Sequence, residues 1–200
     1  MSVCTANVRA QFVAPVDDRR GTMGMLLFIA TEAALFALLF FSYYFLAIFD
    51  PEWPRGEPPN LWLALPMLAV LLLSSIVLHR GERVLKRGDE VRARLAVSGT
   101  LVLGVAFVVL QIFEYRERLR TLSPQSSAYG SIFYAITSFH AAHLALGLLM
   151  LLYVLVLPRL EPTQQPPHRP LHNTALYWHF VDLVWVVIVG LLYAVPNLPR

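Results

Sequence analysis

The feature that most constrains this chain is a series of five continuously apolar runs, each of roughly twenty residues or more. A helix of about twenty residues crosses a hydrocarbon core of roughly 30 Å. Hydrophobic residues make up 57% of the 200 residues and charged residues only 14%, whereas about a quarter of a typical soluble domain is charged. The sequence therefore predicts an all-α fold, an integral membrane bundle of five transmembrane helices.

Proline-rich and charged segments separate the runs. Prolines in 50–60 and in 158–170 should end helices, because proline lacks the N–H group that an α-helix needs. The charged segment 79–94 follows the second run, and we expect it to be helical in part. We expect helices at residues 22–49, 61–78, 95–114, 129–157 and 173–195. The chain then divides into an N-terminal tail (1–21), a membrane domain (22–195) and a C-terminal tail (196–200).

The basic residues are distributed unevenly between the two sides of such a bundle. The N-terminal tail and the second and fourth loops carry 11 Lys and Arg residues, and the opposite side carries 5. The positive-inside rule then predicts a cytoplasmic N-terminus and a C-terminus outside. The net charge of +3 is explained by topology, so we expect no nucleic-acid partner. The first twenty residues lack the apolar core of a signal peptide, so we expect the first helix to serve as the insertion signal.

One carboxylic acid lies within the first apolar run. Glu32 sits in the middle third of that run, in FIATEAALF. Ionisable side chains inside a membrane are costly, so each needs a partner or a function. Glu32 could handle protons, recognise a lipid or a neighbouring helix, or simply donate one hydrogen bond between helices as a neutral acid.

Further polar residues lie at helical spacing in the last three runs. Two pairs are three residues apart and therefore share a helix face. These candidates for an interhelical polar cluster are Glu114, His140, His143, His179 and Asp182. We expect them to form hydrogen bonds across helices, with Asp182 or His179 bonded to the face that carries His140 and His143.

A metal site is the alternative for the same residues. An intramembrane metalloenzyme could use His140, His143, His179 and Asp182. Helical di-metal sites normally use repeated Glu-x-x-His pairs, and the sequence has none, so we expect no metal. A small transporter with Glu32 as proton carrier is a third possibility, although no internal repeat supports it. No haem-attachment motif, phosphate loop or nucleophilic serine elbow occurs, so we expect no catalytic residue.

The aromatic residues near the ends of the runs suggest an aromatic belt at the lipid headgroups. These residues are Trp53, Trp62, Tyr129, Trp178 and Tyr193. Trp185 lies deeper and is expected to pack inside the bundle. The single cysteine, Cys4, excludes an intrachain disulfide.

Four ordered stretches resemble a known family, subunit III of the haem–copper oxidases of the cytochrome c oxidase type. WHFVDLVW resembles the signature of the family's last helix, and LQIFEY resembles its Leu-Gln-x-x-Glu-Tyr. YGSIFYAITSFHAAHLALG resembles its Phe-His-Gly-x-His stretch, and GMLLFIATEAALF resembles the stretch that bears its intramembrane glutamate, at Glu32. The order and spacing hold from about residue 20 to 195, in the short five-helix bacterial form. Two positions depart from the pattern: His172 replaces a glutamate common before the last helix, and Ala141 replaces a glycine.

The resemblance implies a non-catalytic core subunit of a respiratory terminal oxidase that reduces O₂ to water and pumps protons. Such a subunit packs mainly against subunit I, near subunit II and other oxidase subunits, in a bacterial inner membrane. The resemblance also implies that the oxidase can belong to a respiratory supercomplex. It binds phospholipid and supports proton uptake, with Glu32 as the candidate residue. It holds no cofactor itself, since haem and copper belong to partner subunits.

The electron donor stays open at this point. The third subunit of a quinol oxidase, or the short homologue associated with nitric oxide reductases, would carry the same motifs. The donor binds to other subunits, so this chain does not separate these cases.

Overall fold

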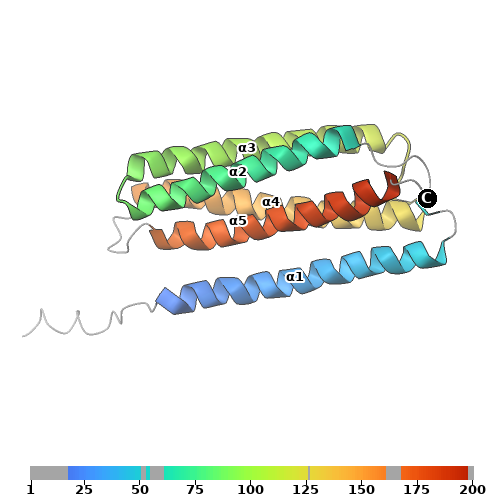
Figure 1. The fold of residues 1–200 in the computed structure, drawn as a ribbon, viewed down its shortest axis with the longest axis horizontal. Helices are drawn as coiled ribbons and strands as arrows, with labels where there is room; N and C mark the ends of the chain where they lie inside the picture. The colour runs from blue at the N-terminus through green and yellow to red at the C-terminus, as the bar shows by residue number, and fades with distance from the viewer. Residues whose placement is uncertain (1–17, 51–52, 55–60, 126, 161–167, 198–200) are drawn as a thin grey trace, which may run out of the picture.

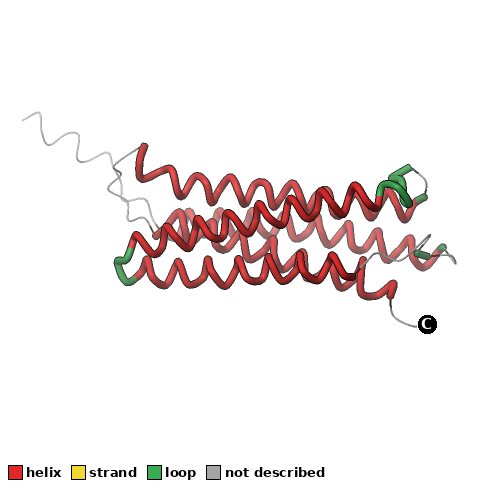
Figure 2. The backbone as a smooth tube through the Cα atoms, turned by 90° about the horizontal axis from the view of Figure 1, so that it is seen from above, coloured by secondary structure: helices red, strands yellow, loops and turns green. Residues whose placement is uncertain are grey.

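The computed structural model of the chain describes residues 18–50, 53–54, 61–125, 127–160 and 168–197. Within these ranges the backbone is helical apart from short turns and helix caps (Figure 2). Five helices are long and apolar enough to cross a membrane, so the predicted all-α integral membrane bundle of five transmembrane helices is confirmed. The elements are α1 (Asp18–Phe49), α2 (Leu61–Lys86), α3 (Glu90–Arg118), α4 (Ala128–Leu160), α5 (His168–Ile188), the π-helical turn η1 (Val189–Ala194) and the 3₁₀ turn η2 (Val195–Asn197). The predicted tails lie largely outside the described residues, as does Cys4.

Helices α2 and α3 extend further than the apolar runs indicate. The prediction ended the second helix at residue 78 and began the third at 95, whereas α2 continues to Lys86 and α3 begins at Glu90. A helix does not have to end where the hydrocarbon ends, because charged residues continue it into the headgroup region. The chain reverses at Gly88, whose φ of 87° suits glycine. Asp89 then caps α3 by accepting a hydrogen bond from the Arg92 backbone N–H at 3.0 Å.

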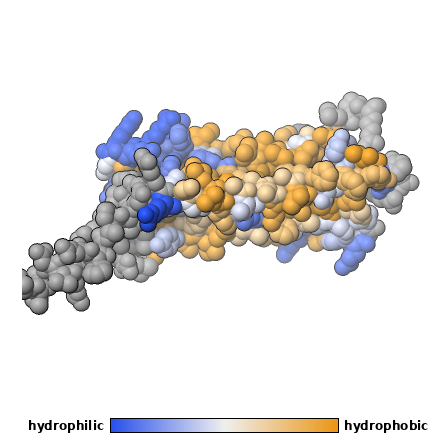
Figure 3. Space-filling view, turned by 90° about the horizontal axis from the view of Figure 1, so that it is seen from below, coloured by the Kyte–Doolittle hydropathy of each residue, from blue (hydrophilic) through white to orange (hydrophobic). Residues whose placement is uncertain are grey.

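The helices alternate in direction along the bundle (Figure 1). The start of α1, the turn between α2 and α3, the end of α4 and the start of α5 lie at one end, and the C-terminus lies at the other. The start of α1 and the charged turn between α2 and α3 therefore lie at the same end of the bundle. Figure 3 shows an apolar surface along the middle of the bundle, with hydrophilic residues gathered towards its two ends.

The core lies around α5. This helix packs against α1, α2 and α4, and the indoles of Trp178 and Trp185 are fully buried in it. Glycines allow the approach, because a Cβ at Gly104 would lie 2.7 Å from the Trp178 ring and one at Gly147 would lie 3.0 Å from it.

The expected aromatic belt is only partly present. Tyr129, Trp178 and Tyr193 are fully buried, and Trp53 is only 5% exposed, so the belt interpretation is wrong for these four residues. Trp62, at the start of α2, is 86% exposed, as a belt residue should be. Position near the end of an apolar run does not show whether a side chain points into the bundle or out of it.

Helix α1 lies along one side of the other four helices (Figure 1). It packs mainly against α4 and α5. In the most apolar stretch of α1 only 6% of the residues are buried inside the chain, against 56% in the stretch that contains α5. The buried hydrophobic residues of α1 that the structure describes are Phe36 and Tyr43. Most of its apolar surface therefore faces away from the rest of the chain.

Candidate functional site

Glu32 on α1 contacts His143 on α4. The distance from Oε2 of Glu32 to Nε2 of His143 is 2.8 Å, and the two side chains are 21% and 11% exposed. The ring of Phe36 lies edge-on to the imidazole, with ring centroids 4.9 Å apart. The polar contact is thus sheltered on the apolar boundary between α1 and α4.

The hydrogen bonds around His143 define where protons must be. Nδ1 lies 2.7 Å from the backbone oxygen of Phe139, and a carbonyl oxygen can only accept, so Nδ1 carries a hydrogen. The contact between Nε2 and Glu32 then needs one further proton, which belongs either to the imidazole or to the carboxyl group. One hydrogen bond therefore joins Glu32 on α1 to His143 on α4.

A second group of polar contacts joins α2 to α5. Ser75 donates a short hydrogen bond to Asp182, and its Oγ lies 2.7 Å from Nδ1 of His179. Because the single hydroxyl hydrogen of Ser75 goes to the carboxylate, Nδ1 of His179 must donate to Ser75. One serine thus connects both polar residues of α5 to α2.

The neighbouring serine adds another bond between the same helices. The indole N–H of Trp178 donates to Oγ of Ser74 at 2.9 Å, and Ser74 donates to the Leu71 backbone oxygen at 2.7 Å. Ser74 and Trp178 are both fully buried. Buried indole N–H groups normally have such a partner, so this bond fixes the ring that fills the core.

A third group joins α3 to α4 and η1. The Tyr193 hydroxyl donates a short hydrogen bond to Glu114. One turn before Glu114, the amide of Gln111 donates to the Thr137 backbone oxygen at 3.3 Å. The residue after Glu114, Tyr115, donates from its hydroxyl to Thr137 Oγ1 at 2.7 Å. Tyr193 lies in the π-helical turn that follows α5. The polar end of α3 thus bonds to two other elements.

His140 differs from the other polar residues. It is fully buried, and neither ring nitrogen has a hydrogen-bond partner among the described residues. Its ring stacks on Trp185 with centroids 4.9 Å apart and lies edge-on to Phe107 at 6.0 Å. In this structure His140 is an aromatic packing residue.

The predicted polar residues thus form separate contacts rather than one cluster. Glu114, His143, His179 and Asp182 each form a hydrogen bond to another element. The predicted bond from His179 or Asp182 to the face of His140 and His143 is wrong, because α5 turns both residues towards Ser75 on α2.

Sequence reasoning missed three polar partners: Ser75, Tyr193, and Glu82, whose Oε1 lies 3.0 Å from Nδ1 of His172. Spacing along one helix shows which residues share a face but not which neighbour they meet. The one available signal was the pair Ser74–Ser75 in an otherwise apolar run.

The residues considered for an intramembrane metalloenzyme do not come together. His143 bonds to α1, whereas His179 and Asp182 bond to α2. Among the described residues, the group of three side chains with metal-ligand spacing is His79, Glu82 and His179. It shares only His179 with the expected set.

Comparison with known proteins matches nearly the whole chain. The family model described as cytochrome c oxidase subunit III matches residues 6–195. A cytochrome c oxidase subunit 3 from Synechocystis is 34% identical over 174 residues, which cover 85% of this chain and 73% of that protein. A probable cytochrome c oxidase subunit 3 from Mycobacterium tuberculosis is 35% identical over 183 residues and covers 86% of each chain. The cytochrome c oxidase subunit 3 of Thermostichus vulcanus is 30% identical over 173 residues, or 86% of this chain and 85% of that protein.

Proposed function

Since the chain belongs to the cytochrome c oxidase subunit III family, we propose that it is a non-catalytic core subunit that stabilises subunit I of a respiratory haem–copper oxidase. The family match over residues 6–195, together with the five-helix membrane bundle, carries this proposal. The chain is a subunit of a multi-subunit oxidoreductase. In the proposed complex, subunits I and II bind the haem and copper, and subunit I is the main contact of this chain.

The polar contacts support a structural role for most of the buried polar residues. Ser75, Asp182 and Glu114 are engaged in bonds between helices of this chain. Residues committed to such bonds hold the bundle together and are not available to a substrate. Reduction of O₂ to water is then the work of the partner subunits.

The exposed face of α1 supports contact with lipid. Large exposed apolar side chains cover much of this helix: Met23, Leu26, Leu27, Leu38, Phe41, Tyr44, Phe45, Ile48 and Phe49. Inside a membrane such a face is covered by acyl chains or by another apolar helix. We place bound phospholipid along this face, next to the boundary between α1 and α4.

Glu32 is the residue proposed to support proton uptake. Its carboxyl group lies 2.8 Å from the His143 imidazole, and both side chains are partly exposed at the edge of the chain. A group that can exchange a proton at this position suits a role in proton delivery, whereas a fully enclosed pair would suit packing alone.

Glu32→Gln tests this role. The amide preserves the side-chain shape and can still bond to His143, but it cannot release a proton. We expect normal assembly with less bound phospholipid or a faster loss of activity during turnover. Glu90→Gln, which changes an exposed carboxylate on α3, is the matched control. Unchanged lipid content and unchanged turnover in the Glu32 variant would contradict the proposal.

Orientation and localisation follow from the charge count. We propose a multi-pass protein of the bacterial plasma membrane with its N-terminus in the cytoplasm. The start of α1, the turn between α2 and α3 and the start of α5 lie at one end of the bundle (Figure 1), and the excess of basic residues in the segments next to them supports a cytoplasmic location for this end. Reporter fusions at each terminus test it: an external N-terminus would overturn the assignment.

Purification of the tagged chain tests the proposed assembly. The complex should contain subunits I and II, show a haem spectrum and accept electrons from cytochrome c. Isolation of the chain without haem-containing partners would contradict the proposal. Oxidation of quinol but not of cytochrome c would reassign the chain to a quinol oxidase. The names of the relatives favour cytochrome c as donor. Native gel electrophoresis of the same preparation shows whether the complex belongs to a supercomplex.

A further inference from the structure

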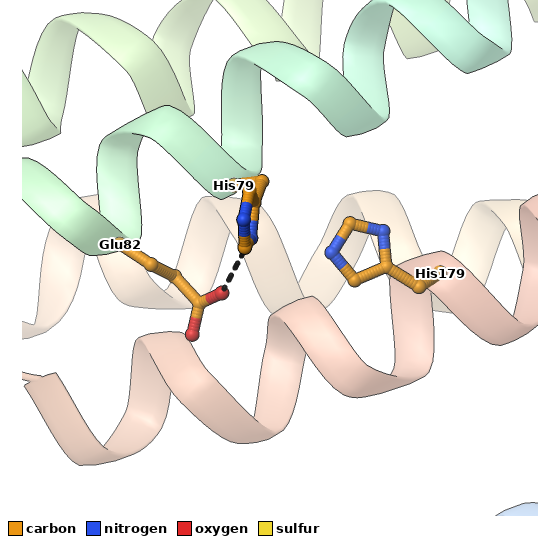
Figure 4. A group of neighbouring side chains, drawn as sticks. All are labelled: His79, Glu82 and His179. Atoms are coloured by element: carbon orange, nitrogen blue, oxygen red, sulfur yellow. Dashed lines mark ion pairs between the residues drawn. The ribbon is translucent and has the colours of Figure 1, made fainter.

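Three metal-ligating side chains meet near the end of α2, next to the contact between Ser75 and His179 described above. His79 and Glu82 lie on one face of α2, and His179 faces them from α5 (Figure 4). One ligand atom from each residue lies within 4.8 Å of the others. The sequence spacing of three between His79 and Glu82 places both on the same side of the helix. Two helices thus present a His₂-carboxylate set to a single point.

This separation fits a divalent cation after small side-chain movements. Nδ1 of His79 lies 3.9 Å from Oε2 of Glu82. Ligand atoms about 2.1 Å from a tetrahedral zinc ion are roughly 3.4 Å apart. The three ligand atoms lie within 4.8 Å of one another, so they must move closer together when a cation binds. His79, whose side chain is 51% exposed, has room to make this adjustment.

His179 is already held in a form suited to metal binding. Its Nδ1 donates to Ser75, and Ser75 in turn donates to Asp182. The hydrogen is therefore on Nδ1, and Nε2 presents its lone pair. Ligand histidines in metal sites are usually fixed in this way by a partner on the other ring nitrogen. Asp182 and Ser75 thus act as positioning residues for the proposed ligand.

Glu82 has a second histidine neighbour. Nδ1 of His172, in the first turns of α5, lies 3.0 Å from Oε1 of Glu82. Oε2, the oxygen nearer His79, is the one free to face a cation. His172 can therefore orient the Glu82 carboxylate through Oε1 while Oε2 binds the cation. This position is one of the two at which the chain departs from the family pattern.

We propose that His79, Glu82 and His179 bind one zinc-like divalent cation that clamps the end of α2 to α5. Two imidazoles and one carboxylate form a donor set typical of zinc, with a fourth position left for water. The inference goes beyond the oxidase assignment, because cation binding here depends only on the contact between α2 and α5. It leaves unchanged the expectation that haem and copper belong to partner subunits.

Zinc binding to the purified complex tests the site. The complex is washed with chelator, and binding of ⁶⁵Zn²⁺ is measured by equilibrium dialysis for the wild type, Glu82→Gln and His79→Asn. We expect each variant to bind one equivalent fewer than the wild type while its haem spectrum stays unchanged. His79 is half exposed, so its variant should assemble even if the Glu82 variant does not. Ser75→Ala should weaken zinc binding by roughly 10- to 100-fold, because His179 loses its orienting bond.

Glu90→Gln is the matched control, since it removes an exposed carboxylate near the same end of the bundle. It should bind as much zinc as the wild type. Equal stoichiometry and affinity in the wild type, Glu82→Gln and His79→Asn would overturn the proposal. An equal loss of zinc in Glu90→Gln would also overturn it, because the bound zinc would then depend on surface charge and not on the three ligands. Neither result bears on which oxidase the chain belongs to.

Discussion

Helices α1 and α5 are both apolar enough to cross a membrane, but they are held in opposite ways. The stretch that contains α5 is 56% buried, contacts three other helices and forms hydrogen bonds to two serines of α2. The stretch within α1 is 6% buried, and its contacts are mainly with α4 and α5. A single polar contact therefore makes up a larger part of what holds α1 to the bundle than of what holds α5.

This difference shows that hydropathy alone does not indicate how firmly a membrane helix is held in its bundle. Lipid is as apolar as a leucine side chain, so packing and hydrogen bonds decide which helices associate. α5 has both, with two buried indoles and several polar partners. α1 has a sheltered Glu32–His143 contact, a bond from Thr22 to Asn173 at 3.2 Å and little buried surface. We expect substitutions in α5 to damage the fold, and substitutions in α1 to change its position against the bundle.

The largest effect is expected at the centre of α5. Trp178→Ala removes a fully buried indole together with its bond to Ser74. Loss of a buried aromatic side chain costs about 3–5 kcal/mol. The free energy of unfolding, measured by adding SDS to detergent micelles, should fall by that amount. Phe113→Ala, at a side chain that is 59% exposed, is the control and should have little effect. Equal losses of unfolding free energy in Trp178→Ala and Phe113→Ala would contradict the conclusion that α5 is held by its buried contacts.

A smaller loss of stability is expected when a larger side chain replaces Gly104, the glycine that contacts the Trp178 ring. In Gly104→Val, the added Cβ would lie 2.7 Å from both Trp178 and Leu148. Overpacking of this kind typically costs about 1–3 kcal/mol. Gly24→Val on α1 is the matched control, since a Cβ there meets nothing within 4 Å. The same SDS titration should show a lower free energy of unfolding for Gly104→Val and no change for Gly24→Val. An unchanged value for Gly104→Val would contradict the close contact between Gly104 and Trp178.

The pairing of polar residues can be tested by double-mutant cycles. Ser75→Ala and Asp182→Asn should be coupled by about 1 kcal/mol, within the range of hydrogen bonds between membrane helices. His143→Ala and Asp182→Asn share no bond in the structure, so their effects should add to within about 0.5 kcal/mol. Coupling between His143 and Asp182, with additive effects for Ser75 and Asp182, would instead support the contact that helical spacing predicted.

The smallest effect on global stability is expected for Glu32→Ala. Loss of one interhelical hydrogen bond in a membrane costs about 0.6 kcal/mol on average. The change should instead be local: hydrogen exchange of α1 amides should become faster, while α5 exchange stays as in the wild type. Glu90→Gln should leave both helices unchanged. Faster exchange in α5 would show that α1 supports the whole bundle.

The fold was largely predictable from the sequence, because apolar runs long enough to span a membrane leave few alternatives to helices. The ends of α2 and α3 were not predictable from hydropathy, since charged residues from Arg80 to Lys86 continue the helix beyond the apolar run. The polar residues were found because charge is rare in such runs.

Their partners were harder to predict. Ser75 was overlooked because a serine in an apolar run often bonds its own helix, as Ser74 does. The burial of Trp178 and Tyr193 depends on how α5 is rotated, which one sequence does not define. Glu32 was singled out because it is an acid within an apolar run, and its role in lipid binding or proton uptake stays a prediction.

The central claim is that the buried polar residues of this chain hold helices together while partner subunits carry out the chemistry. The most direct test is the rate of O₂ reduction by the purified complex before and after this chain is removed with detergent. We predict that the depleted complex keeps its haem spectrum, starts to reduce O₂ and then loses activity over repeated turnovers. Complete loss of the first turnovers, or haem that leaves together with this chain, would contradict the account.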